Sequence, residues 1–70
     1  MTPVERFGRN LFMARRRAGF AQGELARRVS MQQTDLSKLE RGLRNPRLDT
    51  VVRLARGLEL PVCDLLRGID

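Results

Sequence analysis

Four polar side chains in the middle of the chain fall at positions i, i+1, i+4 and i+5, namely Gln33, Thr34, Ser37 and Lys38. On an α-helix this spacing gathers all four on one face. Glutamine can bond adenine bidentately, lysine can donate to guanine, and serine and threonine hydroxyls suit several base edges. The chemistry that this face could perform is therefore the reading of bases in the DNA major groove. The same residues are also ordinary on a solvent face, and alone they favour that simpler interpretation.

The elements that must position these side chains are two short amphipathic segments between Ala21 and Gly42. They meet at Ser30, and each has a single apolar face to bury, carried by Leu25, Ala26 and Val29 in the first segment and by Leu36 and Leu39 in the second. We expect a helix from about Gln22 to Val29 and another from about Gln32 to Arg41, with Gly42 as the C-terminal cap. The sequence thus predicts a helix-turn-helix over about residues 22–41.

The N-terminal segment carries the form of a capping box, Thr2-Pro3-Val4-Glu5, and so predicts a helix start. Apolar residues then recur at helical spacing and predict one buried stripe, formed by Val4, Phe7, Leu11, Ala14 and Ala18. Gly19 is a natural terminator of this helix. We expect this first helix to span Pro3 to Ala18.

Beyond Gly42, Pro46 ends a short loop and a fourth helix follows. Its predicted buried stripe consists of Leu48, Val51, Val52, Leu54, Ala55 and Leu58. Pro61 opens a last short helix, from Val62 to about Arg67, that is apolar on one side. The sequence therefore predicts a single all-α domain of five helices over residues 1–70.

Composition narrows the classes of function. Fourteen basic residues face eight acidic ones, a formal charge of +6, which suits a polyanionic partner without distinguishing DNA from RNA, an acidic protein or an anionic membrane. One cysteine, Cys63, and no histidine remove disulfide frameworks, zinc ligation and histidine-dependent catalysis. We expect Cys63 to be reduced and partly buried. With no signal-peptide-like stretch and no membrane span, we expect a cytoplasmic protein.

Short motifs recur in one register along nearly the whole chain: Phe7-Gly8, Arg15, Gly19-Phe20-Ala21-Gln22, Leu25-Ala26, Leu39-Glu40-Arg41-Gly42, Asn45-Pro46 and Leu54-Ala55. Together they resemble the pattern of the phage-repressor and Cro type of DNA-binding domain, also called the XRE family. The resemblance implies a compact lambda-repressor-like fold whose second and third helices form the helix-turn-helix, with double-stranded DNA as the partner.

By this resemblance the face carrying Gln33, Thr34, Ser37 and Lys38 enters the major groove. It also implies phosphate contacts around that face, expected from Gln22, Gln32, Arg41, Arg44, Asn45 and Arg47. Arg15 and Glu40 match positions that form a buried ion pair in the family. Asp35 is expected to complement the helix dipole rather than to accept from cytosine.

Four positions depart from the family pattern. Ala21 and Gln32 stand where Ser or Thr usually caps the two helices, so side-chain capping is expected to be lost. Ser30 replaces a common glycine, so the turn is expected to be either strained or differently shaped. Phe12 replaces a common arginine and puts an aromatic ring at the margin of the first helix.

A homodimer is expected to form through residues 61–70, where Val62, Leu65, Leu66 and Ile69 offer more apolar surface than so short a helix can bury, with Phe12 contributing. The alternative is that these side chains complete the core of the monomer.

Two classes of function remain. The first is a sequence-specific transcriptional regulator, a repressor or controller binding a two-fold operator as a homodimer, and the second is a protein–protein adaptor of the transcription machinery built on the same fold. The base-reaching polar face and the basic flanks favour the first. No enzyme is expected, because no nucleophile with a base, carboxylate pair or phosphate loop can be assembled, and no cofactor, metal or small-molecule ligand is expected. A phage repressor, a restriction-modification controller, an antitoxin and a regulator of another operon all remain open.

Overall fold

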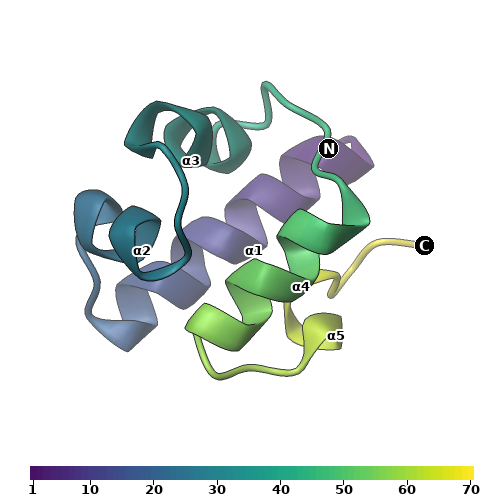
Figure 1. Cartoon of the computed structure of the whole chain (residues 1–70). Helices are drawn as coiled ribbons and strands as arrows, with labels where there is room; N and C mark the ends of the chain where they lie inside the picture. Colours follow the sequence, from purple (N-terminus) through teal and green to yellow (C-terminus); the bar gives the residue numbers. More distant parts are fainter.

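The computed structural model describes all residues, 1–70, and consists of five α-helices without a strand (Figure 1). In chain order they are α1 (Pro3–Ala18), α2 (Gln22–Arg28), α3 (Gln33–Glu40), α4 (Leu48–Gly57) and α5 (Val62–Leu65). The predicted all-α class and the number of helices are confirmed. Four bounds differ by one or two residues: α2 ends at Arg28, α3 lacks Gln32 at its start and Arg41 at its end because both are its caps, and α5 ends at Leu65.

Helix α1 begins as its sequence predicts. The hydroxyl of Thr2 accepts from the backbone N–H of Glu5 at 3.2 Å, and the Glu5 carboxylate accepts from the backbone N–H of Thr2 at 2.8 Å. This backbone hydrogen bond holds the pKa of the Glu5 carboxyl below its usual value, because the bond favours the charged form. The helix ends at Gly19, whose left-handed φ of 82° suits a residue without a side chain.

The turn between α2 and α3 requires an unusual backbone conformation. Ser30 has a φ of 57°, in the left-handed region that costs a residue with a Cβ atom about 1–2 kcal/mol. The N–H of the next residue, Met31, closes the turn by donating to the carbonyl of Ala26 at 2.8 Å. Strain at Ser30, which the missing glycine predicts, is therefore present in the fold.

The core draws on all five helices. Its twelve buried apolar residues are Phe7, Leu11, Leu25, Ala26, Val29, Leu36, Leu39, Val51, Leu54, Ala55, Leu58 and Leu65. Three predictions of burial are wrong. Leu48, the first residue of α4, is 73% exposed because it precedes the turn of the helix that reaches the core. Ala18 at the end of α1 and Cys63 in α5 are also exposed.

A glycine sets the distance between α1 and α3. A Cβ atom at Gly8 would lie 2.4 Å from the carbonyl oxygen of Leu39 and 2.7 Å from that of Glu40, closer than real Cβ contacts. Because Gly8 lacks this atom, the backbone of α3 rests directly on α1. This close approach orients the whole of α3, including its polar face.

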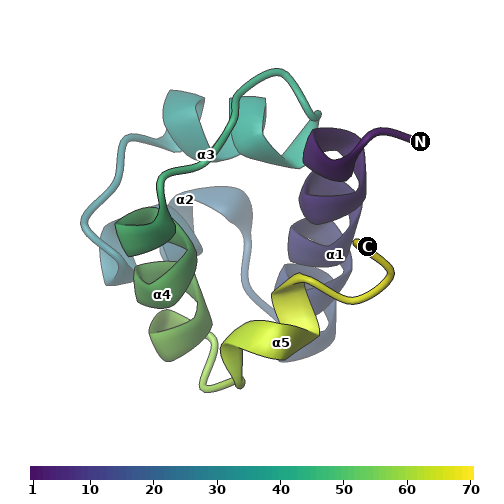
Figure 2. The same ribbon diagram turned by 90° about the vertical axis from the view of Figure 1, so that its right-hand side faces the viewer.

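The arrangement of the helices separates the two ends of the molecule. In Figures 1 and 2, α3 lies at the top and α5 at the bottom, with α1 running between them. Asn10 of α1 holds the C-terminal segment by donating from its side-chain amide to the carbonyls of Leu65, at 3.0 Å, and Arg67, at 2.8 Å.

No helix combines the length and the apolar character needed to cross a membrane.

Candidate nucleic-acid interface

The polar face of α3 is open to solvent. Leu36 and Leu39 are buried in the core, so the opposite side of the helix carries Gln33, Thr34 and Lys38 as exposed residues. Ser37 is half-buried at the edge of this face. In Figures 1 and 2 no other helix lies above α3, and the loop that follows it lies at the same end of the molecule. The four expected base-reading residues thus share one helix whose outer side is uncovered.

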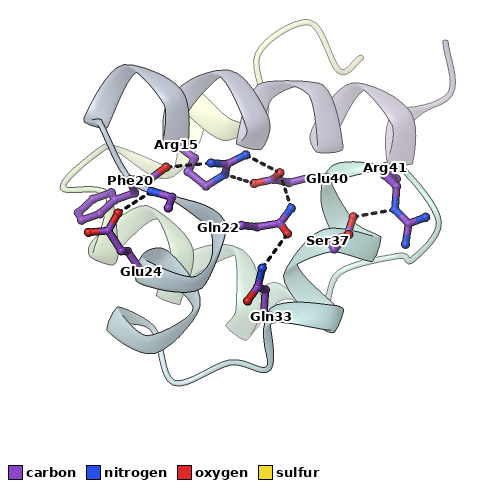
Figure 3. Close-up of polar contacts among 9 residues, drawn as sticks. Arg15, Phe20, Gln22, Glu24, Gln33, Ser37, Glu40 and Arg41 are labelled. Carbon is purple, nitrogen blue, oxygen red and sulfur yellow. Dashed lines mark hydrogen bonds and ion pairs between the residues drawn. The ribbon is translucent and has the colours of Figure 1, made fainter.

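A buried ion pair connects α1 to the end of this helix (Figure 3). Nε of Arg15 lies 2.6 Å from Oε2 of Glu40, and its Nη2 donates to Oε1 of Glu40 at 3.1 Å. The side chains are 9% and 4% exposed. Nη1 of Arg15 also donates to the carbonyl of Phe20 at 2.8 Å. The guanidinium therefore joins α1, the last residue of α3 and the loop that leads into α2.

Gln22, the first residue of α2, links this pair to the polar face. Its Nε2 donates to Oε1 of Glu40 at 3.0 Å, and its Oε1 faces Nε2 of Gln33 at 3.5 Å (Figure 3). The second contact is at the limit of a hydrogen bond and weak. Gln22 is half-buried, so the residue expected to contact phosphate also belongs to a chain of side chains from Arg15 to Gln33. The sequence does not indicate this second role, because Gln22 and Glu40 are eighteen positions apart.

The predicted loss of side-chain capping holds for both helices of the motif. Neither Ala21 nor Gln32 makes a side-chain cap hydrogen bond. At α2 the Glu24 carboxylate partly compensates by accepting from the backbone N–H of Ala21 at 2.8 Å (Figure 3). No equivalent contact exists at α3, where Gln32 is exposed and its side chain remains free.

The remaining expected phosphate contacts lie at the C-terminal end of α3 and in the loop after it. Arg41, Arg44, Asn45 and Arg47 are all exposed. Nη1 of Arg44 lies 2.8 Å from Oδ1 of Asp35, so Asp35 has a cationic partner as well as its place in the first turn of α3. This ion pair was not expected from the sequence, since no helical spacing relates the two residues.

The other loop arginines are weakly held. Nη2 of Arg47 lies 3.7 Å from Oδ2 of Asp49, a fully solvated pair of the kind worth little. Nε of Arg41 donates to the carbonyl of Ser37 at 3.4 Å (Figure 3). Both guanidinium groups are free to turn towards an anionic ligand at this end of the molecule.

The C-terminal segment differs from its prediction. Leu65 is completely buried in the core, so it cannot form part of a dimer surface. Val62 and Ile69 are half-buried and pack against the core, which leaves Leu66, 39% exposed, as the open member of the set. Phe12 is half-buried beneath two guanidinium groups, those of Arg15 and Arg16, at 5.4 and 5.6 Å from the ring centroid.

An apolar recess of about 270 Å³ lies between the N-terminus, α4 and the C-terminal segment. The exposed Leu48 and Leu66 line it together with Pro46, Val4 and Ile69. The sequence does not distinguish Leu48 as a surface residue, because its helical spacing matches the buried stripe of α4. Among the side chains of the fold, no group of three or more His, Cys, Asp or Glu is placed to hold a metal ion.

Comparison with known proteins agrees with this geometry. A family model described as a helix-turn-helix domain matches residues 6–67. An HTH-type transcriptional regulator of Sinorhizobium fredii, y4dJ, is 38% identical over 63 residues, which cover 90% of this chain and 82% of that protein.

Solved structures share the fold closely. The restriction-modification controller protein C.AhdI from Aeromonas hydrophila superposes with a TM-score of 0.86 at 29% identity, covering 89% of this chain and 94% of that one. The clp gene regulator ClgR from C. glutamicum gives a TM-score of 0.91 at 27% identity, covering 94% and 85%. With its motifs, its five helices and the matched family model, the chain belongs to the helix-turn-helix domain family, of the phage-repressor and Cro type.

Proposed function

We propose that this protein is a sequence-specific transcriptional regulator, a repressor or controller that binds a two-fold DNA operator as a homodimer. The observation that carries the proposal is the uncovered face of α3, on which Gln33, Thr34 and Lys38 are exposed and Ser37 borders them. A helix presented in this way fits the major groove, where such side chains distinguish base pairs. The relatives described as an HTH-type transcriptional regulator and as a restriction-modification controller protein support the same function. Because such regulators act on the chromosome, we also propose that the protein works in the cytoplasm.

We further propose that the surface divides its work. Gln33 and Lys38 select the sequence, whereas Gln22, Arg44 and the neighbouring exposed residues Gln32, Arg41, Asn45 and Arg47 hold the phosphates. The buried Arg15–Glu40 pair keeps Gln22 in place, because the side-chain amide of Gln22 donates a hydrogen bond to Glu40 at 3.0 Å. Arg44 must exchange Asp35 for a phosphate, because the two lie 2.8 Å apart in the unbound chain.

The experiment begins with selection of bound sequences from random duplexes, followed by binding titrations at several salt concentrations. Lys38→Ala should relax the preference at one or two base pairs by about 1–3 kcal/mol each. Arg44→Ala should weaken all duplexes alike and reduce the salt slope by about one. Asp35→Asn should strengthen binding to all duplexes, because it releases Arg44 and removes a negative charge.

The control is Arg56→Ala, which removes an exposed arginine of α4 that makes no ion pair and lies outside the loop after α3. It should leave the ranking of sequences unchanged. If Gln33→Ala and Lys38→Ala lower affinity for every duplex equally, α3 does not read the sequence. That result would favour the alternative function, a protein–protein adaptor of the transcription machinery.

For the dimer we propose the apolar recess that Leu48, Leu66 and Ile69 line. Phe12 lies outside this recess, beneath two guanidinium groups. Sedimentation at tens of micromolar should detect a dimer, and Leu66→Glu should convert it to monomer without unfolding it, since this side chain lies at the surface and outside the buried core. A chain that stays monomeric with and without its operator would contradict the proposed dimer.

A further inference from the structure

A second basic surface lies away from α3. It is a groove of about 520 Å³ between α1, the end of α4 and the C-terminal segment. Four guanidinium groups surround it, those of Arg6, Arg9, Arg17 and Arg67. Its floor is apolar and is formed chiefly by Met13, Ala14, Leu58 and Leu60.

The positive charge of this groove is largely uncompensated. The only carboxylate that lines the groove is that of Asp64, and its Oδ1 lies 2.8 Å from Nη2 of Arg67. Arg6, Arg9 and Arg17 make no ion pair with any residue of the chain. Arginines gathered in this way repel one another, and a ligand with several negative charges relieves that repulsion.

The operator is poorly placed to be this ligand. In Figures 1 and 2, α5 and the adjoining part of α1 lie at the end of the molecule opposite to α3. The domain measures 30 × 22 × 21 Å, and α1 lies between a duplex on the outer face of α3 and most of the groove. Arg9, which also lines a recess with Glu40 and Arg41, is the member of the groove nearest to α3. The groove therefore remains free when α3 is occupied.

A second copy of the chain is no better complement. Of the eight acidic residues, five already pair with arginines: Asp35, Glu40, Asp49, Glu59 and Asp64. Glu5 and Glu24 are held by backbone N–H groups at the starts of α1 and α2, which leaves Asp70 alone. No acidic patch of this protein matches four arginines.

The apolar floor distinguishes a protein ligand from a nucleic-acid backbone. Phosphates can use the guanidinium groups but have nothing to place against Met13 and Leu60. An amphipathic peptide can place carboxylates on the arginine forks and apolar side chains on the floor at the same time.

We propose that this groove docks an acidic, amphipathic segment of another protein while α3 remains available to DNA. The segment presents carboxylates to Arg6, Arg9 and Arg17 and inserts at least one large apolar side chain between Met13 and Leu60. The domain then connects DNA at one end with a protein partner at the other.

The test uses the intact chain labelled with nitrogen-15 and a synthetic helical peptide with glutamates on one face and leucines on the other. Amide shifts are expected at Asn10, Met13 and Leu60 and not at Gln33 or Lys38. A control peptide in which the leucines are replaced by serines should bind much more weakly.

Charge reversal locates the site. The double variant Arg9→Glu/Arg17→Glu should weaken peptide binding roughly tenfold, because two exposed ion pairs are lost and replaced by repulsion. The matched control is Arg53→Glu/Arg56→Glu, which makes the same change of net charge with exposed arginines of α4 and should have a much smaller effect. All four side chains are exposed, so both variants should retain the amide spectrum of the folded domain.

Four outcomes would overturn the proposal. They are absence of peptide binding, equal binding of the serine control peptide, equal losses in the two double variants, and amide shifts confined to α3. If a non-operator duplex shifts the groove amides and the peptide does not, the groove is a nucleic-acid site and the proposed protein partner is wrong. None of these results depends on whether α3 reads an operator.

Discussion

Replacing Arg15 by alanine tests the network behind α3 most directly. The change leaves the Glu40 carboxylate, whose side chain is 4% exposed, with the amide of Gln22 as its remaining side-chain partner. It also removes the guanidinium donor from the carbonyl of Phe20. A buried negative charge without a countercharge is among the most costly defects that a single substitution creates.

The expected magnitude follows from this burial. Breaking one side of a buried ion pair costs about 3–5 kcal/mol of unfolding free energy. A domain of this length has a total stability of roughly 4–10 kcal/mol, so Arg15→Ala should remove a large part of it. At about 4–8 °C per kcal/mol for small domains, the melting temperature should fall by at least about 12 °C.

The assay is a set of thermal and urea unfolding curves followed by circular dichroism. The control, Arg16→Ala, removes the neighbouring arginine, which is exposed and contacts only the ring of Phe12, so it should cost less than about 1 kcal/mol. The double variant Arg15→Met/Glu40→Leu removes both charges and should cost less than Arg15→Ala alone, because no charge is left unpaired.

Equal melting temperatures for Arg15→Ala and Arg16→Ala would refute the assignment of the pair as buried and structural. A double variant less stable than Arg15→Ala would show that the attraction between the charges, and not the orphaned carboxylate, decides the loss.

Three further changes test the backbone and the capping of the helices. Gly8→Ala should destabilise the fold by about 1–3 kcal/mol, because the new Cβ meets backbone carbonyls of α3. In the control Gly23→Ala the new Cβ meets only the movable end of a side chain, so its effect on stability should be close to neutral. Equal urea midpoints for the two variants would contradict this reasoning. Ser30→Gly should stabilise by up to about 1 kcal/mol by relieving the left-handed strain, and a lower melting temperature would count against it. Because the folded pKa of Glu5 is lowered, its contribution to stability should be complete above the pKa of the unfolded chain and lost as the pH falls through the folded pKa. The stability difference from Glu5→Gln should therefore vanish in acid, and a difference that persists there would exclude this linkage.

Local interactions made several features predictable from the sequence. The bounds of α1 follow from Thr2, Glu5 and Gly19, whose contacts lie within one or two turns of the helix ends. The burial of Leu36 and Leu39 follows from helical spacing, and it places Gln33 and Lys38 on the opposite side without further information. Such features depend on near neighbours in the chain, and no knowledge of the fold is needed to read them.

Tertiary structure alone decided the features that depend on how one helix meets another. Leu48 and Leu65 both fit an apolar helical stripe, yet Leu48 precedes the part of α4 that reaches the core. Leu65 lies inside the core, and its carbonyl accepts a hydrogen bond from Asn10 of α1. The pairing of Arg44 with Asp35 likewise depends on the path of the loop after α3. The spacing of apolar residues indicates which side of a helix is apolar. How much of that side is buried depends on where the neighbouring helices cross it, and this is decided only in the tertiary structure.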